Sequence, residues 1–178
     1  REKDKMKLSI HNTVGKATKE QLSQLGDNWL NVECTYEQAF ELITFDGVAT
    51  SAELWTDNRC DANFVSRQLI MIDIDDGMTI QDLINDEFYN KYGAGFYTSP
   101  SHSDAQDKFR ICFVVETPFT DVDRCQLFIH ALRKYFYPKS DKQPTNPASY
   151  FNGTPNCVIK ECHNKIIPNE TVDAMIAL

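Results

Sequence analysis

The chain has 178 residues, of which 42% are hydrophobic and 11% are aromatic, and its formal net charge is −8 at pH 7. These values predict one folded domain over residues 1–178, and no apolar run approaches the roughly 20 residues that a membrane-spanning helix needs. The negative charge counts against a passive, nonspecific nucleic-acid binder, because such binding depends on neutralising phosphates.

The six cysteines are scattered without a Cys-x-x-Cys pair, which is typical of buried thiols rather than disulfides. The charged opening, residues 1–5, lacks an initiator methionine and precedes no apolar signal segment. We therefore expect a cytoplasmic protein without membrane partners, and a chain excised from a longer protein.

The first predicted elements are a strand and a helix. Residues 6–10 alternate between apolar and polar side chains, which predicts a half-buried strand. Thr35 and Gln38 have the spacing of a capping box, which predicts a helix that continues through Phe40 and Ile43.

The central part of the chain predicts three further strands and one helix. Residues 69–75, 96–98 and 109–115 are the predicted strands. Thr79 is predicted to cap a helix whose apolar face is formed by Ile80, Leu83, Ile84 and Phe88.

The last part predicts a helix, a long loop and a short terminal helix. Asp121 is predicted to begin a helix that runs to about Tyr135, with an apolar stripe of Cys125, Phe128, Leu132 and Tyr135. Residues 138–156 read as a loop with a short strand at 149–151, and the tail from Pro168 predicts a helix on Val172, Met175 and Ile176. The order predicts an α/β fold of the α+β kind, with a central sheet that is mixed or largely antiparallel.

Two carboxylates leave the apolar strand on the same face. Asp73 and Asp75 are two residues apart, so their Cβ atoms lie roughly 6–7 Å from each other, whereas Asp76 points to the opposite face. Two like charges so placed repel, and they need a cation or a Lys or Arg partner. The turn at Gly77 puts them at an open edge, where they can hold a divalent metal ion. The alternative is that they only end the strand and cap the next helix.

Hydroxyls, an imidazole and two cations follow on the next two predicted strands. Ser101 and His102 come after the strand at 96–98, and Lys108 and Arg110 share one face of the strand that follows. Arginine suits bidentate phosphate recognition, so these four residues are predicted to hold a nucleotide triphosphate opposite the carboxylates. Taken singly, His102 would be a loop histidine with a backbone partner, and Lys108 and Arg110 would form a solvated strand face.

A third acid is expected, because metal ions that activate a 3′-hydroxyl and hold a triphosphate have coordination positions beyond two carboxylates. Asp141 is the predicted third ligand, and a solvated turn aspartate is the alternative. The predicted catalytic and metal-binding residues are therefore Asp73, Asp75 and Asp141.

This arrangement resembles the archaeo-eukaryotic primase superfamily, in particular the primase-polymerase domains at the front of phage and plasmid replication proteins. The resemblance spans about residues 58–156. It rests on the order of the Asp73-x-Asp75 strand, the hydroxyl-rich loop ending in His102, the Lys108-x-Arg110 strand and the later Asp141. The approach to the acidic strand, residues 58–64, is also similar.

The resemblance implies a primase-polymerase catalytic core on a modified RNA-recognition-like central sheet flanked by helices. Such a domain would bind Mg²⁺ or Mn²⁺ and join dNTP or NTP substrates on a single-stranded DNA template and primer, as a DNA primase or DNA polymerase. It would act in the cytoplasm of a bacterial host, and similar proteins commonly work with a helicase domain or partner.

Two other functions fit parts of the sequence. A primase-like module without catalysis would bind DNA as a replication initiator. A Mg-dependent phosphatase with an aspartate nucleophile would also place an Asp-x-Asp pair after an apolar strand, and residues 75–79 partly mimic its motif. The phosphatase predicts repeated parallel strand-helix units.

Overall fold

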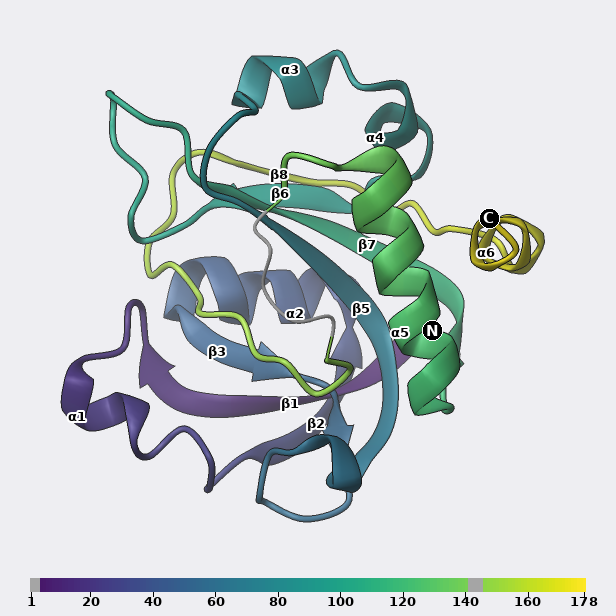
Figure 1. Ribbon diagram of the computed structural model, residues 1–178. Helices are drawn as coiled ribbons and strands as arrows, with labels where there is room; N and C mark the ends of the chain where they lie inside the picture. The colour runs from purple at the N-terminus through teal and green to yellow at the C-terminus, as the bar shows by residue number, and fades with distance from the viewer. Residues whose placement is uncertain (1–3, 141–145) are drawn as a thin grey trace.

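A computed structural model describes residues 4–140 and 146–178, which form two antiparallel sheets with helices packed against them (Figure 1). The smaller sheet has the order β2 (Leu30–Thr35), β1 (Lys5–Val14), β3 (Val48–Ser51). The larger sheet has the order β4 (Glu53–Leu54), β5 (Phe64–Ile74), β7 (Phe109–Phe119), β6 (Gly95–Thr98), β8 (Lys160–Cys162).

The fold is therefore a mixed α+β arrangement, as the sequence predicts. Every ladder between these named strands is antiparallel. The repeated parallel units that the phosphatase alternative requires are not found in the part of the chain that the structure describes.

The helices are short. They are α1 (Lys19–Leu22), α2 (Tyr36–Glu41), α3 (Ile80–Ile84), α4 (Glu87–Tyr92), α5 (Val122–Ala131) and α6 (Asn169–Ile176). Two π-helical turns, Leu42–Asp46 and Leu132–Phe136, continue α2 and α5, and a 3₁₀ turn, Asp61–Asn63, precedes β5. Among residues 4–140 and 146–178, no helix has the length and apolar character needed to span a bilayer.

The larger sheet is buried on both faces. Ile72 and Ile111 belong to a core cluster shared with α3, α4, α5 and α6, whereas Met71 and Val114 belong to a cluster shared with β1 and α2 (Figure 1). A strand that is buried on both faces needs apolar side chains on both, so its sequence is a continuous apolar run, as in the second half of β5. Each buried aliphatic side chain contributes about 1.5–3 kcal/mol, so this packing fixes the point where the carboxylates leave the sheet.

The strands predicted at residues 6–10, 69–75, 96–98 and 109–115 are confirmed, and so are the predicted helix starts. Thr35, Thr79 and Asp121 each accept a hydrogen bond from a backbone N–H of the first helical turn that follows, and they cap α2, α3 and α5. The helix predicted after Pro168 is α6. β5 begins earlier than predicted, because Ser66 pairs with β4. The prediction started later because polar residues around Ser66 interrupt the apolar run.

The single helix predicted after Thr79 is wrong, because the chain forms α3 and α4 instead. Asp86 has an extended backbone and its side chain accepts from the Tyr89 N–H at 2.9 Å, so it caps a second helix within the apolar pattern. Ile84, predicted on the apolar face, is 40% exposed. Tyr135 is likewise exposed and does not extend the buried stripe of α5.

The smaller sheet contains strands that the sequence did not reveal. β2 is an edge strand whose first residue, Leu30, is exposed, so it lacks a clear apolar alternation. The strand predicted at residues 149–151 is wrong, because there the structure shows only an isolated bridge between Phe151 and Thr50.

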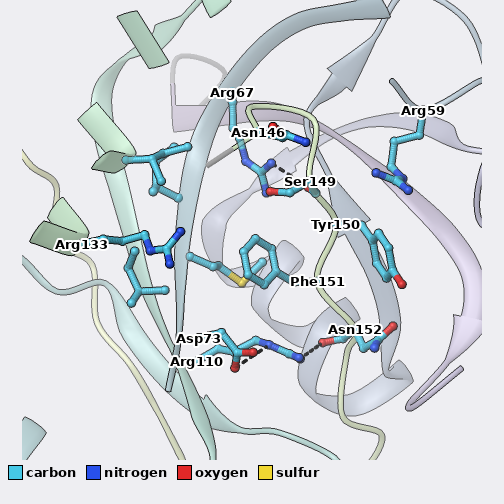
Figure 2. A pocket seen from close by; sticks show the side chains of 14 residues that line it. Arg59, Arg67, Asp73, Arg110, Arg133, Asn146, Ser149, Tyr150, Phe151 and Asn152 are labelled. Carbon is cyan, nitrogen blue, oxygen red and sulfur yellow. Dashed lines mark hydrogen bonds and ion pairs between the residues drawn. The ribbon is translucent and has the colours of Figure 1, made fainter. Parts of the chain in front are cut away.

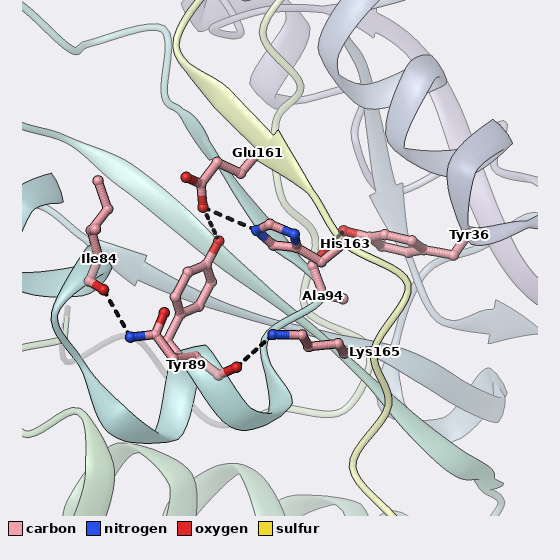
Figure 3. Close-up of polar contacts among 8 residues, drawn as sticks. Tyr36, Ile84, Tyr89, Ala94, Glu161, His163 and Lys165 are labelled. Carbon is pink, nitrogen blue, oxygen red and sulfur yellow. Dashed lines mark hydrogen bonds and ion pairs between the residues drawn. The ribbon is translucent and has the colours of Figure 1, made fainter.

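Polar contacts hold the edge strand β8 (Figure 3). The Tyr89 hydroxyl donates to Glu161 Oε1 at 2.8 Å, and His163 Nε2 lies 3.1 Å from the same oxygen. The carbonyl of Ala94 accepts from the His163 N–H at 2.6 Å and from the Tyr36 hydroxyl at 2.8 Å. These contacts tie β8 to α4 and α2, so the neighbouring strand β6 is fixed on both of its edges.

Residues 146–152, called the crossing segment below, are held by a buried arginine. Arg67 is 3% exposed, and its guanidinium donates to the carbonyls of Leu69 at 3.0 Å, Pro147 at 2.8 Å and Ser149 at 2.8 Å. Burial lowers the pKa of Arg67 to about 10, so the group is still charged at neutral pH. The fork of this one side chain therefore joins β5 to the crossing segment.

Replacing Arg67 by lysine is expected to destabilise the fold by about 2–4 kcal/mol, because a single ammonium cannot satisfy three buried carbonyls. Urea unfolding measures the change. The matched control is Arg124→Lys, since Arg124 is an exposed arginine of α5 that pairs with Asp173. The control is expected to stay within about 0.5 kcal/mol of the wild type. Equal losses in both variants would contradict the structural role of Arg67.

Candidate functional site

Three polar side chains form a row across the larger sheet where β5 ends. The register pairs Asp73 of β5 with Arg110 of β7, and Arg110 with Tyr97 of β6. Arg110 Nε lies 3.4 Å from Asp73 Oδ1, and the two side chains are 11% and 18% exposed. The Asn152 carbonyl accepts from the Arg110 guanidinium at 2.6 Å and from the Tyr97 hydroxyl at 2.9 Å. The row is therefore held in a fixed geometry beneath the crossing segment.

Arg110 is a permanent cation in this row. Burial lowers its pKa, whereas Tyr97, Asp73 and Asp75 raise it, and the net result is a pKa above the ordinary value for arginine. Asp73 thus has the cationic partner that the sequence required for a pair of neighbouring acids.

A second pair of charges lies where the ladder between β5 and β7 ends. Ile74 and Phe109 are the last registered residues of the ladder between β5 and β7, so Asp75 and Lys108 follow them directly. The N–H of Ser99 donates to the Lys108 carbonyl at 2.9 Å, which continues the ladder one residue beyond β6. Asp75 raises the pKa of Arg110, so its carboxylate lies near the first row, and Asp75 is exposed there. Lys108 is partly buried.

His102 lies in the loop of residues 99–108, called the histidine loop below. Its Nδ1 accepts from the Lys108 N–H at 3.2 Å. A ring nitrogen that accepts carries no proton, so the neutral imidazole bears its hydrogen on Nε2 and can donate to an anionic oxygen. The backbone partner that the sequence offered as an alternative is present, and it fixes the tautomer of the ring.

The histidine loop is fastened to the turn that carries the second acid. Gln106 Nε2 donates to the Asp75 carbonyl at 2.9 Å and to Asp76 Oδ1 at 3.2 Å. Asp107 Oδ2 accepts from the Ile80 N–H at 2.9 Å, at the start of α3. The imidazole and the Asp75 carboxylate are therefore carried by two segments that are joined by three hydrogen bonds.

Two predicted site residues remain, Ser101 and Asp141. Ser101 is exposed in the histidine loop. Asp141 lies outside the described residues, so its role as a third ligand stays a prediction. Within residues 4–140 and 146–178, no three His, Cys, Asp or Glu side chains gather closely enough to hold a metal ion. Asp73 and Asp75 are the described part of the predicted metal site.

A cavity of about 370 Å³ runs from Asp73 along the outer edge of β5 (Figure 2). β4 pairs with β5 only at Phe64 and Ser66, so the second half of β5 has no strand neighbour on this edge among the described residues. The cavity lies between α5 and the crossing segment. Its lining includes four arginines, one acid and a tyrosine: Arg59, Arg67, Arg110, Arg133, Asp73 and Tyr150.

Sequence reasoning missed most of this cavity. Arg59 donates to the carbonyls of Leu25 at 3.3 Å and Ala148 at 3.0 Å, and its guanidinium carbon lies 4.6 Å from the ring centroid of Tyr150. Arg59 belongs to residues 58–64, a segment that resembled the primase approach to the acidic strand but had no assigned chemistry. No local pattern marks Arg59, because the carbonyls that accept its hydrogen bonds are 34 and 89 residues away in the chain.

Comparisons with known proteins support the fold. No protein-family model matches the chain. No curated protein matches it either. A solved structure, the AEP domain of the cyanophage S-2L primase-polymerase, matches with a TM-score of 0.50 and 12% sequence identity. The match covers 99% of this chain and 90% of that domain, so the likeness concerns the whole described fold.

Removing the Gln106 amide is expected to loosen the turn after β5. Gln106→Ala deletes two hydrogen bonds, so amide hydrogen exchange in the peptide covering residues 75–80 is expected to rise about tenfold. Exchange is measured by mass spectrometry. The control is Asp104→Ala, a change at another exposed residue of the same loop, which is expected to leave exchange at the wild-type rate. Equal exchange in both variants would show that Gln106 does not join the two segments.

Proposed function

We propose that this chain catalyses nucleotidyl transfer on single-stranded DNA, as a primase-polymerase domain of phage or plasmid replication. The observation that carries the proposal is the pair of charge rows at the end of β5. Asp73 pairs with Arg110 across the sheet, and Asp75 and Lys108 flank the end of that ladder. His102 lies in a loop fastened beside them. The fold shared with a primase-polymerase domain supports the reaction class by analogy, and the site carries the argument.

The more accessible site residues would bind the nucleotide, and the buried one would position an acid. His102 Nε2 and Lys108 would bind phosphate oxygens of the incoming dNTP or NTP, and Ser101 would assist from the histidine loop. Arg110 is largely buried and donates to the crossing segment, so we assign it to holding Asp73 in place. This role replaces the direct phosphate contact that its position in the sequence predicts.

The donors present fit Mg²⁺ or Mn²⁺. Carboxylate oxygens are the ligands that these ions prefer, and Asp75 is exposed at the strand end. Asp73 is partly exposed and would share its carboxylate between the metal and Arg110. Asp141 would add the third acid from outside the described residues. When bound, the metal would lower the pKa of the primer 3′-hydroxyl and stabilise the pyrophosphate leaving group.

The resemblance to primase-polymerase domains supplies the remaining parts of the proposal. The larger sheet would be a modified RNA-recognition-like sheet, and residues 1–178 would form one catalytic domain at the front of a longer replication protein. Its partners would be a single-stranded DNA template, a primer and a helicase, in the cytoplasm of the bacterial host.

One observation favours a second candidate, a primase-like module that binds DNA without catalysis. Arg110 neutralises Asp73 within the protein, so that acid has a structural use even without a metal ion. Under this candidate Asp75 has no catalytic task, and its removal leaves DNA binding intact.

Asp75→Asn is expected to reduce nucleotide incorporation about 100-fold or more, because it removes a metal-binding carboxylate without changing side-chain size. The assay is primer extension and unprimed synthesis on single-stranded DNA with Mg²⁺ or Mn²⁺. The matched control is Asp76→Asn, since Asp76 Oδ1 accepts from Gly77 and Gln106 and an asparagine oxygen can do the same. This neighbour is expected to stay within about threefold of the wild type.

Equal incorporation by the two variants would remove Asp75 from the catalytic site. No incorporation by the wild type with either metal, while single-stranded DNA is still bound, would favour the module without catalysis.

A further inference from the structure

The side chain of Lys139 lies across the turn that follows the two acids of β5. A methyl group added at Gly77 would lie 3.2 Å from Cδ of Lys139 and 3.4 Å from its Cβ, so the aliphatic stem of the lysine is packed on the glycine. The backbone of Gly77 has a φ of 81°, a left-handed conformation that favours glycine. The glycine therefore both forms the turn and leaves room for the lysine stem.

Lys139 belongs to residues 137–140, called the lysine turn below, which are fixed in place. The Ser140 N–H donates to the Tyr137 carbonyl at 3.0 Å and closes a β-turn. Tyr137 is 2% exposed, and its hydroxyl donates to Asp86 Oδ2 at 2.8 Å. Asp86 caps α4, which follows α3 in the chain. The lysine turn is therefore joined to the segment that continues from the end of β5, and this keeps the stem over the glycine.

The turn after β5 contacts two other segments of the chain. One is the histidine loop, from which Gln106 donates to the Asp75 carbonyl and to Asp76 Oδ1. The other is the lysine turn, whose Lys139 stem lies against Gly77. The exposed carboxylate of Asp75 therefore has both segments as neighbours, although the two are far apart in the sequence.

The ammonium of Lys139 extends beyond the part of the side chain that is packed. Lys139 is an exposed residue, and lysine commonly covers a surface with its methylene groups while its charged end remains in water. Cδ lies over Gly77, which is two residues beyond Asp75, and two further bonds of the flexible stem carry the ammonium. An anion held at the end of β5 is therefore within reach of this group. A lysine ammonium is a common ligand of phosphate oxygens.

We propose that Lys139 binds the terminal phosphates of the incoming nucleoside triphosphate, the part that leaves as pyrophosphate. The choice of ligand rests on the proposed function, which places the triphosphate at Asp75, His102 and Lys108. Lys139 approaches the same acid from a separate segment. Its ammonium has three N–H donors and no acceptor, which suits charged phosphate oxygens. A cation placed there stabilises the negative charge that develops on the leaving group.

A purely structural role for Lys139 is the alternative, in which the stem covers Gly77 and the charge only meets water. Three substitutions separate the two roles. Lys139→Met keeps an unbranched stem and removes the charge, Lys139→Ala removes both, and Lys139→Arg keeps the charge. A contact with phosphate depends on the charge, whereas packing on the glycine depends on the stem.

The test measures nucleotide binding without catalysis. Isothermal titration calorimetry follows dTTP and dTMP with Mg²⁺ and without DNA, so that no transfer takes place. Lys139→Met and Lys139→Ala are each expected to weaken dTTP binding about fivefold to tenfold, because both lack the ammonium. Their binding of dTMP, which has no terminal phosphates, is expected to stay within about twofold of the wild type. Lys139→Arg is expected to keep dTTP binding within about threefold.

The matched control is Lys134→Ala, which removes an exposed lysine from the π-helical turn that precedes the lysine turn. The Lys134 ammonium lies 5.2 Å from the ring centroid of Tyr135. The control is expected to bind dTTP within about twofold of the wild type, because its charge is directed to that ring. Thermal melting of each variant confirms that it is folded.

Four outcomes would overturn the inference. Binding of dTTP by Lys139→Met at the wild-type affinity would leave the lysine with a packing role alone. Equal weakening of dTMP binding would place the effect on the nucleoside or on the fold. Equal weakening by Lys134→Ala would reduce the effect to net charge. A wild-type protein that binds no dTTP would remove the ligand itself.

The proposed function is tested separately, by primer extension. Incorporation by the wild type, together with wild-type dTTP binding by Lys139→Met, would overturn the role of Lys139 and leave the function standing. Binding of dTTP that depends on the charge of Lys139, in a protein that incorporates no nucleotide, would keep the site and overturn the catalytic proposal.

Discussion

A buried guanidinium needs hydrogen-bond partners, and in this protein those partners decide where residues 146–152 lie. Arg59, Arg67 and Arg110 come from three places in the chain, and each donates to carbonyls of the crossing segment. The segment has little ladder pairing of its own, since Phe151 makes a single bridge to Thr50. The guanidinium groups of these arginines therefore supply the hydrogen bonds that a neighbouring strand would otherwise make to the segment. The cavity along β5 and the cover over the Asp73 row both depend on them.

The two acids at the end of β5 are placed in different environments by the same sheet. Asp73 lies one pair inside the ladder, opposite Arg110 and beneath the crossing segment, whereas Asp75 lies one residue beyond it and is exposed. Their spacing follows from the alternation of the strand, and their environments follow from where the strand ends. Asp73 is therefore held by Arg110, whereas the carboxylate of Asp75 is open to solvent.

The fold of this protein is similar to that of a solved structure although the two sequences share few residues. A chain that shares 12% of its residues with a phage primase-polymerase domain still follows it with a TM-score of 0.50. Cores tolerate extensive apolar substitution when volume and pattern are kept, so a fold outlasts the identities of its residues. Polar positions are less interchangeable, so the proposed function rests on Asp73, Asp75, His102 and Lys108.

The sequence by itself determined the strand that delivers Asp73 and Asp75, and the caps at Thr35, Thr79 and Asp121. These features depend on side-chain alternation and on hydrogen bonds within a few residues, which a local pattern contains. Only the tertiary structure decided that Arg110 pairs with Asp73 and that Gln106 fastens the histidine loop. It also decided that arginines from distant segments surround one cavity. Those contacts join residues tens of positions apart, and their energies depend on burial that no local window of sequence records.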